Sequence, residues 1–347
     1  SLALAALGTI ADLVPLNKES RILARFGLKH LGSNPSPGLK ALIEESGLKP
    51  GILPESEDVT FKLAPRINAC GRLNDPETAS SLMLAQDLSD CRILAKKMDA
   101  YNNERKEIEA RLTEDALAQA EENFSDKTAI VVCGKGEAWN PGVVGIVAGK
   151  MANSLGKPCI VLAQADDSSY RGSGRGVQGL NLIDALSKCQ EFLTHWGGHP
   201  VAVGLSLETK NLEFFTKAFV DSIDLLSGGK IAPPALKISA TIEQNDLRPE
   251  LLAELAQLAP FGQENPEPIL ALKEVQLAQA PRMVGSGAHF QFSIYNGSNP
   301  ISGIAWKMAD RIPPTNTNLD LAFRLRWNNW NGRRNLQMDL QDWRVSN

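Results

Sequence analysis

The sequence predicts a multidomain α/β protein that ends in a small β-barrel. Its 347 residues are too many for one ordinary domain and suggest two or three compact units. Two short apolar runs flank a helical segment within residues 128–163, which is the pattern of a β-α-β unit. After Pro233 and Pro234 the pattern changes to alternating strands, which is typical of a small barrel.

Residues 1–85 consist of short helical segments separated by turn signals, and we interpret them as the last part of a larger domain. The chain opens on an apolar run that leads into Asp12, which fits a buried helix better than a signal peptide. We therefore expect the natural N-terminus to lie upstream. Residues 88–124 contain neither Pro nor Gly, and apolar residues recur there at helical spacing. They predict a connecting helix about 50 Å long within residues 86–127.

Residues 128–230 predict an α/β domain. The apolar runs 128–133 and 158–163 are expected to be parallel buried strands around a helix at 143–155. A further helix at 180–193 and a Gly-Gly-His turn at 197–199 complete this domain. Residues 231–347 predict a barrel of five or six strands, of which the oligonucleotide-binding (OB) barrel is the commonest kind. Its strands are expected at 236–242, 269–277, 289–295, 301–306, 319–327 and 336–343, with a helix at 249–258.

Composition and charge narrow the possible functions. The chain is 43% hydrophobic and 22% charged, and no apolar run approaches the length of a membrane span. Its five cysteines are widely spaced and odd in number, which favours reduced thiols in a cytoplasm. The net charge is −4, but residues 281–347 hold seven Arg and one Lys against four Asp, so this segment is +4 and the remainder −8. A local basic surface is therefore compatible with a nucleic-acid partner.

The segment from His195 to His199 is the most informative one. Gly197 and Gly198 allow backbone amides to approach a ligand closely, and the following His199 can donate to an anion. A tight turn whose histidine caps a neighbouring strand is the alternative. A zinc pair formed by the two histidines is disfavoured, because the two glycines break the helix that would place them on one face.

A second glycine-rich segment follows the predicted strand at 158–163. Residues 174–179 match G-x-G-x-x-G, but the strand ends too early for a dinucleotide-binding turn, so a nicotinamide cofactor is disfavoured. Arg171, Ser173 and Arg175 place two guanidinium groups and a hydroxyl among glycines. This combination suits a phosphate.

Residues 61–73 combine cations with an amide in a segment that we expect to be rich in turns. Arg66 and Arg72 are candidates for binding a nucleic-acid backbone, and surface ion pairs are the alternative. Asp12 is the one acid in an apolar neighbourhood. It caps a helix or binds a metal, although a single carboxylate cannot build a metal site.

The C-terminal barrel carries cations on one face of a predicted strand. Arg324 and Arg326 alternate with apolar residues over 319–327. Trp330, Arg333 and Arg334 follow in a predicted loop at 328–334, where stacking surfaces and positive charge together are typical of proteins that bind single strands. We expect Trp330 and these arginines to be exposed.

Six motifs in register resemble the bacterial single-strand-specific exonucleases of the RecJ family, which belong to the DHH phosphoesterases. The resemblance covers essentially the whole chain and rests on residues 6–16, 64–73, 142–148, 172–175, 197–199 and 260–268. It implies a remnant of the DHH domain at 1–85, a connecting helix at 86–127, a DHH-associated (DHHA1-type) domain at 128–230 and an OB domain at 231–347. It also implies 5′-to-3′ hydrolysis of single-stranded DNA in repair and recombination, with two Mn²⁺ or Mg²⁺ ions.

The resemblance also assigns individual residues. Asn68 and Arg72 would line the catalytic groove, Ser173 and Arg175 would contact the 5′ phosphate or the neighbouring backbone, and His199 would steady the scissile phosphate. Asp12 matches a metal ligand, but the other ligands of the family lie mostly in a portion N-terminal to this chain. A two-metal mechanism needs both ions, so we expect this chain alone to be inactive.

Two departures from the family pattern weaken the assignments near them: Asn140-Pro141 precedes the Gly-Val-Val-Gly motif, and Gly176 stands where Ser is common. Two other functions stay open. One is a non-catalytic scaffold that binds single-stranded DNA beside a helicase or a single-strand-binding protein. The other is a relative that acts on short RNA or nucleotide phosphates, and the C-terminal barrel argues against it.

Overall fold

The computed structural model describes residues 2–49, 51–73, 75–233, 235–296, 299–330 and 333–346. They form two compact units. The barrel unit consists of Ser1–His30, Leu53–Ser56 and Ala235–Asn347, and the α/β unit consists of Leu31–Ile52 and Glu57–Pro234. Within the described ranges, no helix combines the length and the apolar character needed to cross a membrane.

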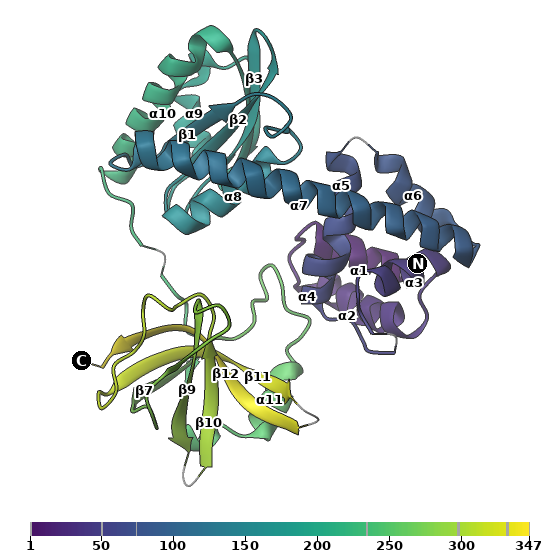
Figure 1. Ribbon diagram of the computed structural model, residues 1–347, viewed down its shortest axis with the longest axis vertical. Helices are drawn as coiled ribbons and strands as arrows, with labels where there is room; N and C mark the ends of the chain where they lie inside the picture. Colours follow the sequence, from purple (N-terminus) through teal and green to yellow (C-terminus); the bar gives the residue numbers. More distant parts are fainter. Residues whose placement is uncertain are drawn as a thin grey trace. The chain divides into compact units, whose positions relative to one another are not determined.

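The α/β unit begins with helices that pack along the first half of a long helix, α7 (Figure 1). These are α3 (Pro37–Glu45), α5 (Ala64–Arg72), α6 (Pro76–Leu84) and α7 itself (Leu88–Phe124). A short helix α4 (Ser56–Asp58) and a π-helical turn η1 (Val59–Leu63) lead directly into α5. The expectation of a turn-rich segment at 61–73 is therefore wrong. Pro65 lies in the first turn of α5, directly after η1, so the helical run continues past a residue that has no amide to donate.

The predicted helix over 88–124 is confirmed as α7. It starts at Asp87, whose carboxylate accepts hydrogen bonds from the backbone amides of Ser89 at 2.8 Å and Asp90 at 3.1 Å. Small buried residues such as Ala95 and Ala116 let both halves of the helix approach their neighbours closely. One continuous helix thus joins the helical group to the sheet that follows.

The sheet of the α/β unit has the strand order β1-β2-β3-β5-β4. Strands β1 and β2 are parallel and joined by α8, which confirms the predicted β-α-β unit, and the remaining pairs are antiparallel. The elements are β1 (Ile130–Gly134), α8 (Val144–Leu155), β2 (Cys159–Asp166), β3 (Ser169–Arg175), α9 (Leu182–Ser187), η2 (Gln190–Phe192), β4 (His195–His199), β5 (Ala202–Glu208), η3 (Thr209–Asn211) and α10 (Leu212–Ser227).

Two expectations about this domain need correction. The helix expected over 180–193 is only the six-residue α9 followed by the 3₁₀ turn η2. The Gly-Gly-His segment is not a turn but lies in the edge strand β4, because His195–His199 pairs with β5. The turn comes just after it, before Ala202.

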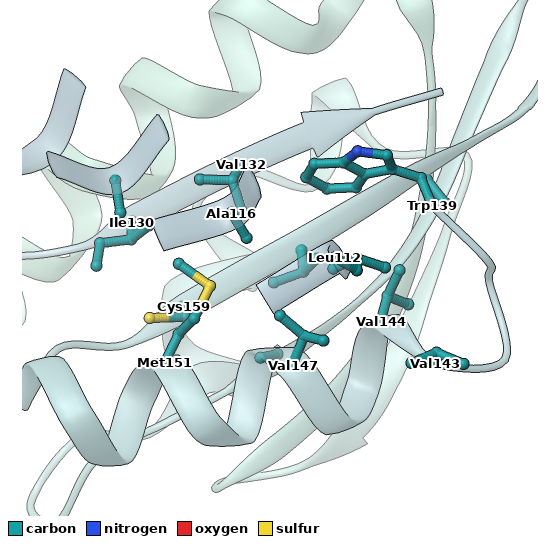
Figure 2. Close-up of a cluster of buried hydrophobic side chains, with 14 of the residues drawn as sticks. Leu112, Ala116, Ile130, Val132, Trp139, Val143, Val144, Val147, Met151 and Cys159 are labelled. Atoms are coloured by element: carbon teal, nitrogen blue, oxygen red, sulfur yellow. The ribbon is translucent and has the colours of Figure 1, made fainter. Parts of the chain in front are cut away.

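Hydrophobic cores lie on both faces of this sheet. On one face the second half of α7 and α8 pack against β1 and β2, and Figure 2 shows Leu112, Val147 and Met151 directed toward Ile130 and Val132. On the other face α9 and α10 bury two phenylalanines, Phe215 and Phe219, against Leu205 of β5. On the first face α7 lies against β1 and α8 lies against β2 and β3, but the buried apolar residues of this core do not include residues of β3, β5 or β4.

The barrel unit contains α1 (Leu2–Ala11), most of α2 (Lys18–Ser33) and a seven-stranded sheet with the order β6-β7-β11-β12-β10-β9-β8. A bridge between Leu277 and Ile294 links the chain after β7 to β9. The core contains Phe290, Phe292 and Phe323. The elements are β6 (Ala240–Thr241), η4 (Gln244–Asp246), α11 (Pro249–Ala256), β7 (Leu270–Val275), β8 (Arg282–Val284), β9 (His289–Asn296), β10 (Asn299–Ala305), β11 (Leu319–Trp330) and β12 (Arg333–Val345).

The barrel strands agree with the predicted positions except at three places. The strand expected over 236–242 has only two residues, in β6 at the edge of the sheet, and the short strand β8 was not predicted. The loop expected over 328–334 is mostly strand, because β11 and β12 continue until Trp330 pairs with Arg333. Residues 331 and 332 lie outside the described ranges.

Candidate functional site

The α/β unit contains a pocket of about 590 Å³ that is rich in cations and small residues. Three segments line it: the end of α5, the turn before α8, and strands β3, β5 and β4. Among the lining residues there are two arginines and one histidine but no carboxylate. The lining consists of Gly71, Arg72, Asn140, Pro141, Gly142, Arg171, Gly172, Ser173, His195, Trp196, Gly204, Leu205 and Ser206.

The floor of the pocket is one face of the β3-β5-β4 part of the sheet. Residues paired across neighbouring strands point to the same face, so this face carries three cross-strand rows. These rows lie on the same face of the sheet as the apolar residues of β2 that pack under α8, because Val161 of β2 pairs with Ser173. The rows are Arg175-Ala202-His199, Ser173-Gly204-Gly197 and Arg171-Ser206-His195.

Two of the three residues in the middle row, Gly197 and Gly204, have no side chain, and the packing of the chain does not require glycine at either position. A Cβ atom added to Gly197 or Gly204 would meet nothing within 4 Å, and neither residue has a positive φ. Glycine inside a strand costs about 0.5–1 kcal/mol relative to alanine. Gly198 differs, because its φ is 142° and a Cβ there would lie 2.3 Å from the Ala202 carbonyl oxygen. Gly197 and Gly204 therefore leave room for a ligand, whereas Gly198 shapes the backbone.

Arg72 forms the wall opposite the sheet. Its Nη1 donates to the Gly142 carbonyl oxygen at 2.6 Å. A Cβ on Gly142 would lie 2.3 Å from the Arg72 carbonyl oxygen, so only glycine lets the end of α5 approach this turn so closely. Asn140 holds the turn in shape, since its Oδ1 accepts from the Gly142 amide at 2.8 Å.

Ser173 and Arg175 reach from β3 to the first turn of α8. A Cβ on Gly145 would lie 3.3 Å from Ser173 Oγ and 3.5 Å from an Nη atom of Arg175. The amides of Val144 and Ile146 in this turn donate to the carbonyl oxygens of Asn140 and Val143, so the helix N-terminus contributes mainly its partial positive charge. A hydroxyl, a guanidinium group and a helix N-terminus thus face the same space, an arrangement that suits a phosphate.

Burial and neighbouring cations destabilise the charged form of the arginines at this site, Arg72 and Arg175. Burial, followed by the nearby guanidinium groups of Arg105 and Arg175, lowers the pKa of Arg72, and Glu109 opposes this shift. Burial also lowers the pKa of Arg175. Both side chains stay protonated at neutral pH, because guanidinium groups do not lose their proton in proteins. An anion between them would relieve the repulsion.

The structure brings several predicted site residues together. Arg72 and Ser173 line the pocket. Arg175, Gly197, Gly198 and His199 are not among its lining residues, although they lie in the same part of the sheet, where Arg175 and His199 share a row. Asn68 is exposed on α5, one turn before Arg72. Arg171 was noted in the glycine-rich segment without being assigned to the site. The sequence reasoning missed His195, Asn140 and Ser206, and only the period-two spacing of His195 and Gly197 could have placed His195 on this face.

Arg66 is not among the residues that line the pocket. Its Nε and Nη2 donate to Asp99 Oδ1 of α7 at 2.9 and 2.8 Å, and its side chain is only 13% exposed. It thereby joins α5 to α7, which corresponds to the ion-pair alternative for this segment.

The predicted residues of the barrel are tied to other groups. Arg324 and Arg326 form ion pairs with Glu267, at 3.6 and 2.8 Å. The Arg334 guanidinium group lies 4.2 Å from the Trp327 ring centroid, in a cation–π contact. The side chains of Trp330 and Arg333 lie outside the part of the chain that the structure describes.

Asp12 follows α1 and is exposed. The described part of the chain contains no group of three or more His, Cys, Asp or Glu side chains that could hold a metal ion. Asp12 alone does not fit a two-metal centre.

Comparison with known proteins gives two family models and several long relatives. The model described as the DHHA1 domain matches residues 126–224, and the model described as the RecJ OB domain matches residues 238–342. The single-stranded-DNA-specific exonuclease RecJ of Bacillus subtilis is 34% identical over 349 residues, covering 99% of this chain and 44% of the relative. The protein of the same name from Salmonella typhimurium is 36% identical over 357 residues, covering 98% and 60%.

The solved structures agree with these relatives. The crystal structure of RecJ from Thermus thermophilus in complex with Mn²⁺ matches with a TM-score of 0.86 at 28% identity, covering 100% of this chain and 50% of that one. The same protein in complex with Mg²⁺ gives the same TM-score. The chain thus spans about half the length of the relatives that it matches.

Proposed function

Because this chain belongs to the RecJ family, we propose that it is the strand-binding part of an exonuclease that degrades single-stranded DNA from the 5′ end. The observation that carries this proposal is the acid-free pocket of the α/β unit, with its two arginines and the open space at Gly204. Phosphate contacts position a nucleic acid without reading its sequence. Such a pocket therefore suits any sequence of single strand.

The proposed roles follow the cross-strand rows of the sheet. Ser173 and Arg175 bind the 5′ phosphate against the first turn of α8, and Arg72 closes on it from the opposite wall. Gly197, with Gly198 shaping the backbone beside it, allows the strand to lie close to the sheet. His199 steadies the phosphate to be cleaved, and Asn68 extends the same wall as Arg72.

The proposed domains are a DHH remnant at 1–85, the connecting helix at 86–127, a DHHA1-type domain at 128–230 and an OB domain at 231–347. In the OB domain, the proposed strand-binding residues are Arg324, Arg326, Trp330, Arg333 and Arg334. Stacking of bases on tryptophan and contacts of phosphates with arginine are typical of OB domains that bind single strands. The stacked pair of Arg334 and Trp327 supports this surface.

The metal-dependent step belongs to the whole enzyme. The Thermus protein was crystallised with Mn²⁺ or Mg²⁺, and we propose that this family member also uses such ions. Asp12 is the one proposed ligand in this chain. We place the others in the part of the relatives' length that this chain does not span, and we expect this chain alone to bind DNA without hydrolysing it. An encoded Asp-x-Asp element and Asp-His-His triplet upstream would support the nuclease, and their absence would favour a scaffold.

We further propose that the protein acts in the cytoplasm, beside a helicase or a single-strand-binding protein. Its five cysteines are free thiols, as is usual in a reducing compartment.

Titration of this chain with labelled 5′-phosphorylated oligonucleotides tests the proposal. We expect single-stranded DNA to bind more tightly than duplex, with little base preference, and the logarithm of the affinity to fall with that of the salt concentration by about 0.7 for each phosphate contacted. The Arg333→Ala/Arg334→Ala variant is expected to bind more weakly and with a smaller salt slope. Unchanged affinity in that variant would refute the role of the barrel, and salt-insensitive binding of the parent chain would refute the proposal.

The open row of glycines gives a second prediction. Gly204→Ala is expected to keep or slightly raise the stability, because its Cβ meets no atom of the chain, and to weaken binding of the 5′-phosphorylated strand about tenfold. Fluorescence anisotropy and thermal melting measure the two effects. Gly228→Ala is a matched control: its Cβ would also meet open space, but its φ is 65°, so it is expected to lower the stability without changing the affinity. Equal affinities of Gly204→Ala and the parent would contradict the role of the glycine row.

A further inference from the structure

Helix α2 carries a groove that the proposed function does not use. The groove has a volume of about 440 Å³ and belongs to the barrel unit. Of its six lining residues, four are cations, two are apolar and none is an acid. The lining consists of Lys18, Arg21, Ile22, Arg25, Phe26 and Lys29.

The packing of α2 fixes which of its faces points outward. Gly27 lies against α1, because a Cβ atom there would lie 2.2 Å from the Cβ atom of Ala6. Ala24, one turn earlier on the same side of α2, is fully buried. The lining residues are spaced three or four apart, so they follow one outer face of the helix. From Lys18 to Lys29 this face is about 16 Å long.

Two apolar side chains in the middle of the groove are exposed. Ile22 is 58% exposed and Phe26 is 51% exposed, and they lie one helical turn apart. Single exposed apolar residues are common on protein surfaces, but adjacent ones with a polar rim are typical of interaction sites. The groove therefore offers an apolar centre between charged ends.

The cations of the groove can accept an external carboxylate. Lys18 and Arg25 are exposed, and neither forms an ion pair within the described ranges. Arg21 Nη2 donates to the Leu258 carbonyl oxygen at 2.7 Å, which holds the side chain in place but brings no negative charge. Glu19 is the one acid in the sequence of α2, and it does not line the groove.

We infer that this groove binds an acidic segment of a partner protein, in which apolar side chains one helical turn apart are flanked by carboxylates. The apolar pair covers Ile22 and Phe26, and the carboxylates pair with Lys18 and Arg25. Amphipathic helices bind grooves through anchors with this spacing. A nucleic acid fits less well, because Ile22 has no aromatic ring on which a base could stack. This inference does not depend on the proposed function.

A designed acidic peptide tests the inference. The probe is a fluorescein-labelled helical peptide with leucines along one face and glutamates elsewhere, and its scrambled form has the same composition without an apolar face. We expect this chain to bind the probe, with an affinity that falls as salt is added, and to bind the scrambled peptide at least about tenfold more weakly. Phe26→Ala is expected to weaken binding of the probe about tenfold and Arg25→Ala about fivefold. Fluorescence anisotropy measures each affinity.

Ile93→Ala and Arg111→Ala are the matched controls. Both residues are exposed on α7 and lie outside the lining of the groove. Their affinities for the probe should equal that of the parent, and the melting temperatures of all four variants should agree, because each removes an exposed side chain. Oligo(dT) should bind Arg25→Ala and Phe26→Ala as tightly as it binds the parent.

Three results would overturn the inference. The scrambled peptide could bind as tightly as the probe, which would show attraction by charge alone. Arg25→Ala and Phe26→Ala could leave the affinity for the probe unchanged, which would place the peptide elsewhere on the chain. Both variants could lose the same factor for oligo(dT) as for the probe, which would make the groove a nucleic-acid surface.

Discussion

Replacement of Glu109 by alanine is expected to lower the free energy of unfolding by about 3–5 kcal/mol. Glu109 lies on α7 and is only 5% exposed. Its carboxylate forms ion pairs with Arg105 on the same helix and with Lys150 on α8. Arg105 is 11% exposed and also donates to Asn102 Oδ1 at 2.7 Å. Without the carboxylate, a nearly buried guanidinium group is left without a counter-charge, and chemical denaturation measures the loss.

Lys150→Ala provides the comparison within the same network. The Lys150 side chain is 54% exposed, so water weakens its ion pair with Glu109. In the variant, Glu109 still has Arg105 as its counter-charge. We expect this variant to lose less than about 1 kcal/mol, as for other exposed ion pairs. Similar losses in Glu109→Ala and Lys150→Ala would show that the carboxylate does not act as the buried counter-charge of Arg105.

Replacement of Arg72 by alanine is expected to weaken binding of 5′-phosphorylated single-stranded DNA by about 2 kcal/mol, or roughly 30-fold. Arg72 is the charged wall of the pocket, and it is held in place by its hydrogen bond to the Gly142 carbonyl oxygen. The variant removes both the charge and this contact between α5 and the turn before α8. Fluorescence anisotropy with a labelled oligonucleotide measures the affinity.

Two variants accompany Arg72→Ala. Arg72→Lys keeps the charge but loses the planar fork of donors, so it should recover only part of the affinity. Arg92→Ala removes a half-exposed arginine that pairs with Glu44, and its affinity should stay at the parent value. Equal affinities of Arg72→Ala and Arg92→Ala would exclude Arg72 from the binding site.

Much of the fold follows from local sequence patterns. The apolar runs at 128–133 and 158–163 are bounded by Gly and Pro, so the parallel strands β1 and β2 could be predicted. The helix α7 follows from 37 residues without Pro or Gly. The Gly-Gly-His segment was misread because glycine is usually a turn signal, and the pairing with β5 that makes it a strand is not visible in its own sequence.

The candidate site could be predicted only in part, because partners that are distant in the sequence decide it. Arg66 resembles a phosphate ligand in its own segment, but Asp99 lies 33 residues away. Arg326 likewise meets Glu267 across 59 residues. His195 joins Arg171 only because both β4 and β3 pair with β5. Sequence motifs identified Gly197, Gly198 and Arg72 as site residues. The cross-strand rows could not be predicted in this way, because they depend on the order in which β3, β5 and β4 pair.

The close fit between Arg72 and Gly142 has a practical consequence for anyone dissecting this protein. The family model for the α/β domain starts at residue 126, after the segment that carries Arg72. A truncation made at that boundary would preserve the strands and discard one side of the cavity, so it would underestimate the affinity of the intact binding surface. The shortest truncation that keeps both Arg72 and the strands of the pocket has to begin before α5. It must also include α7, which connects α5 to the sheet.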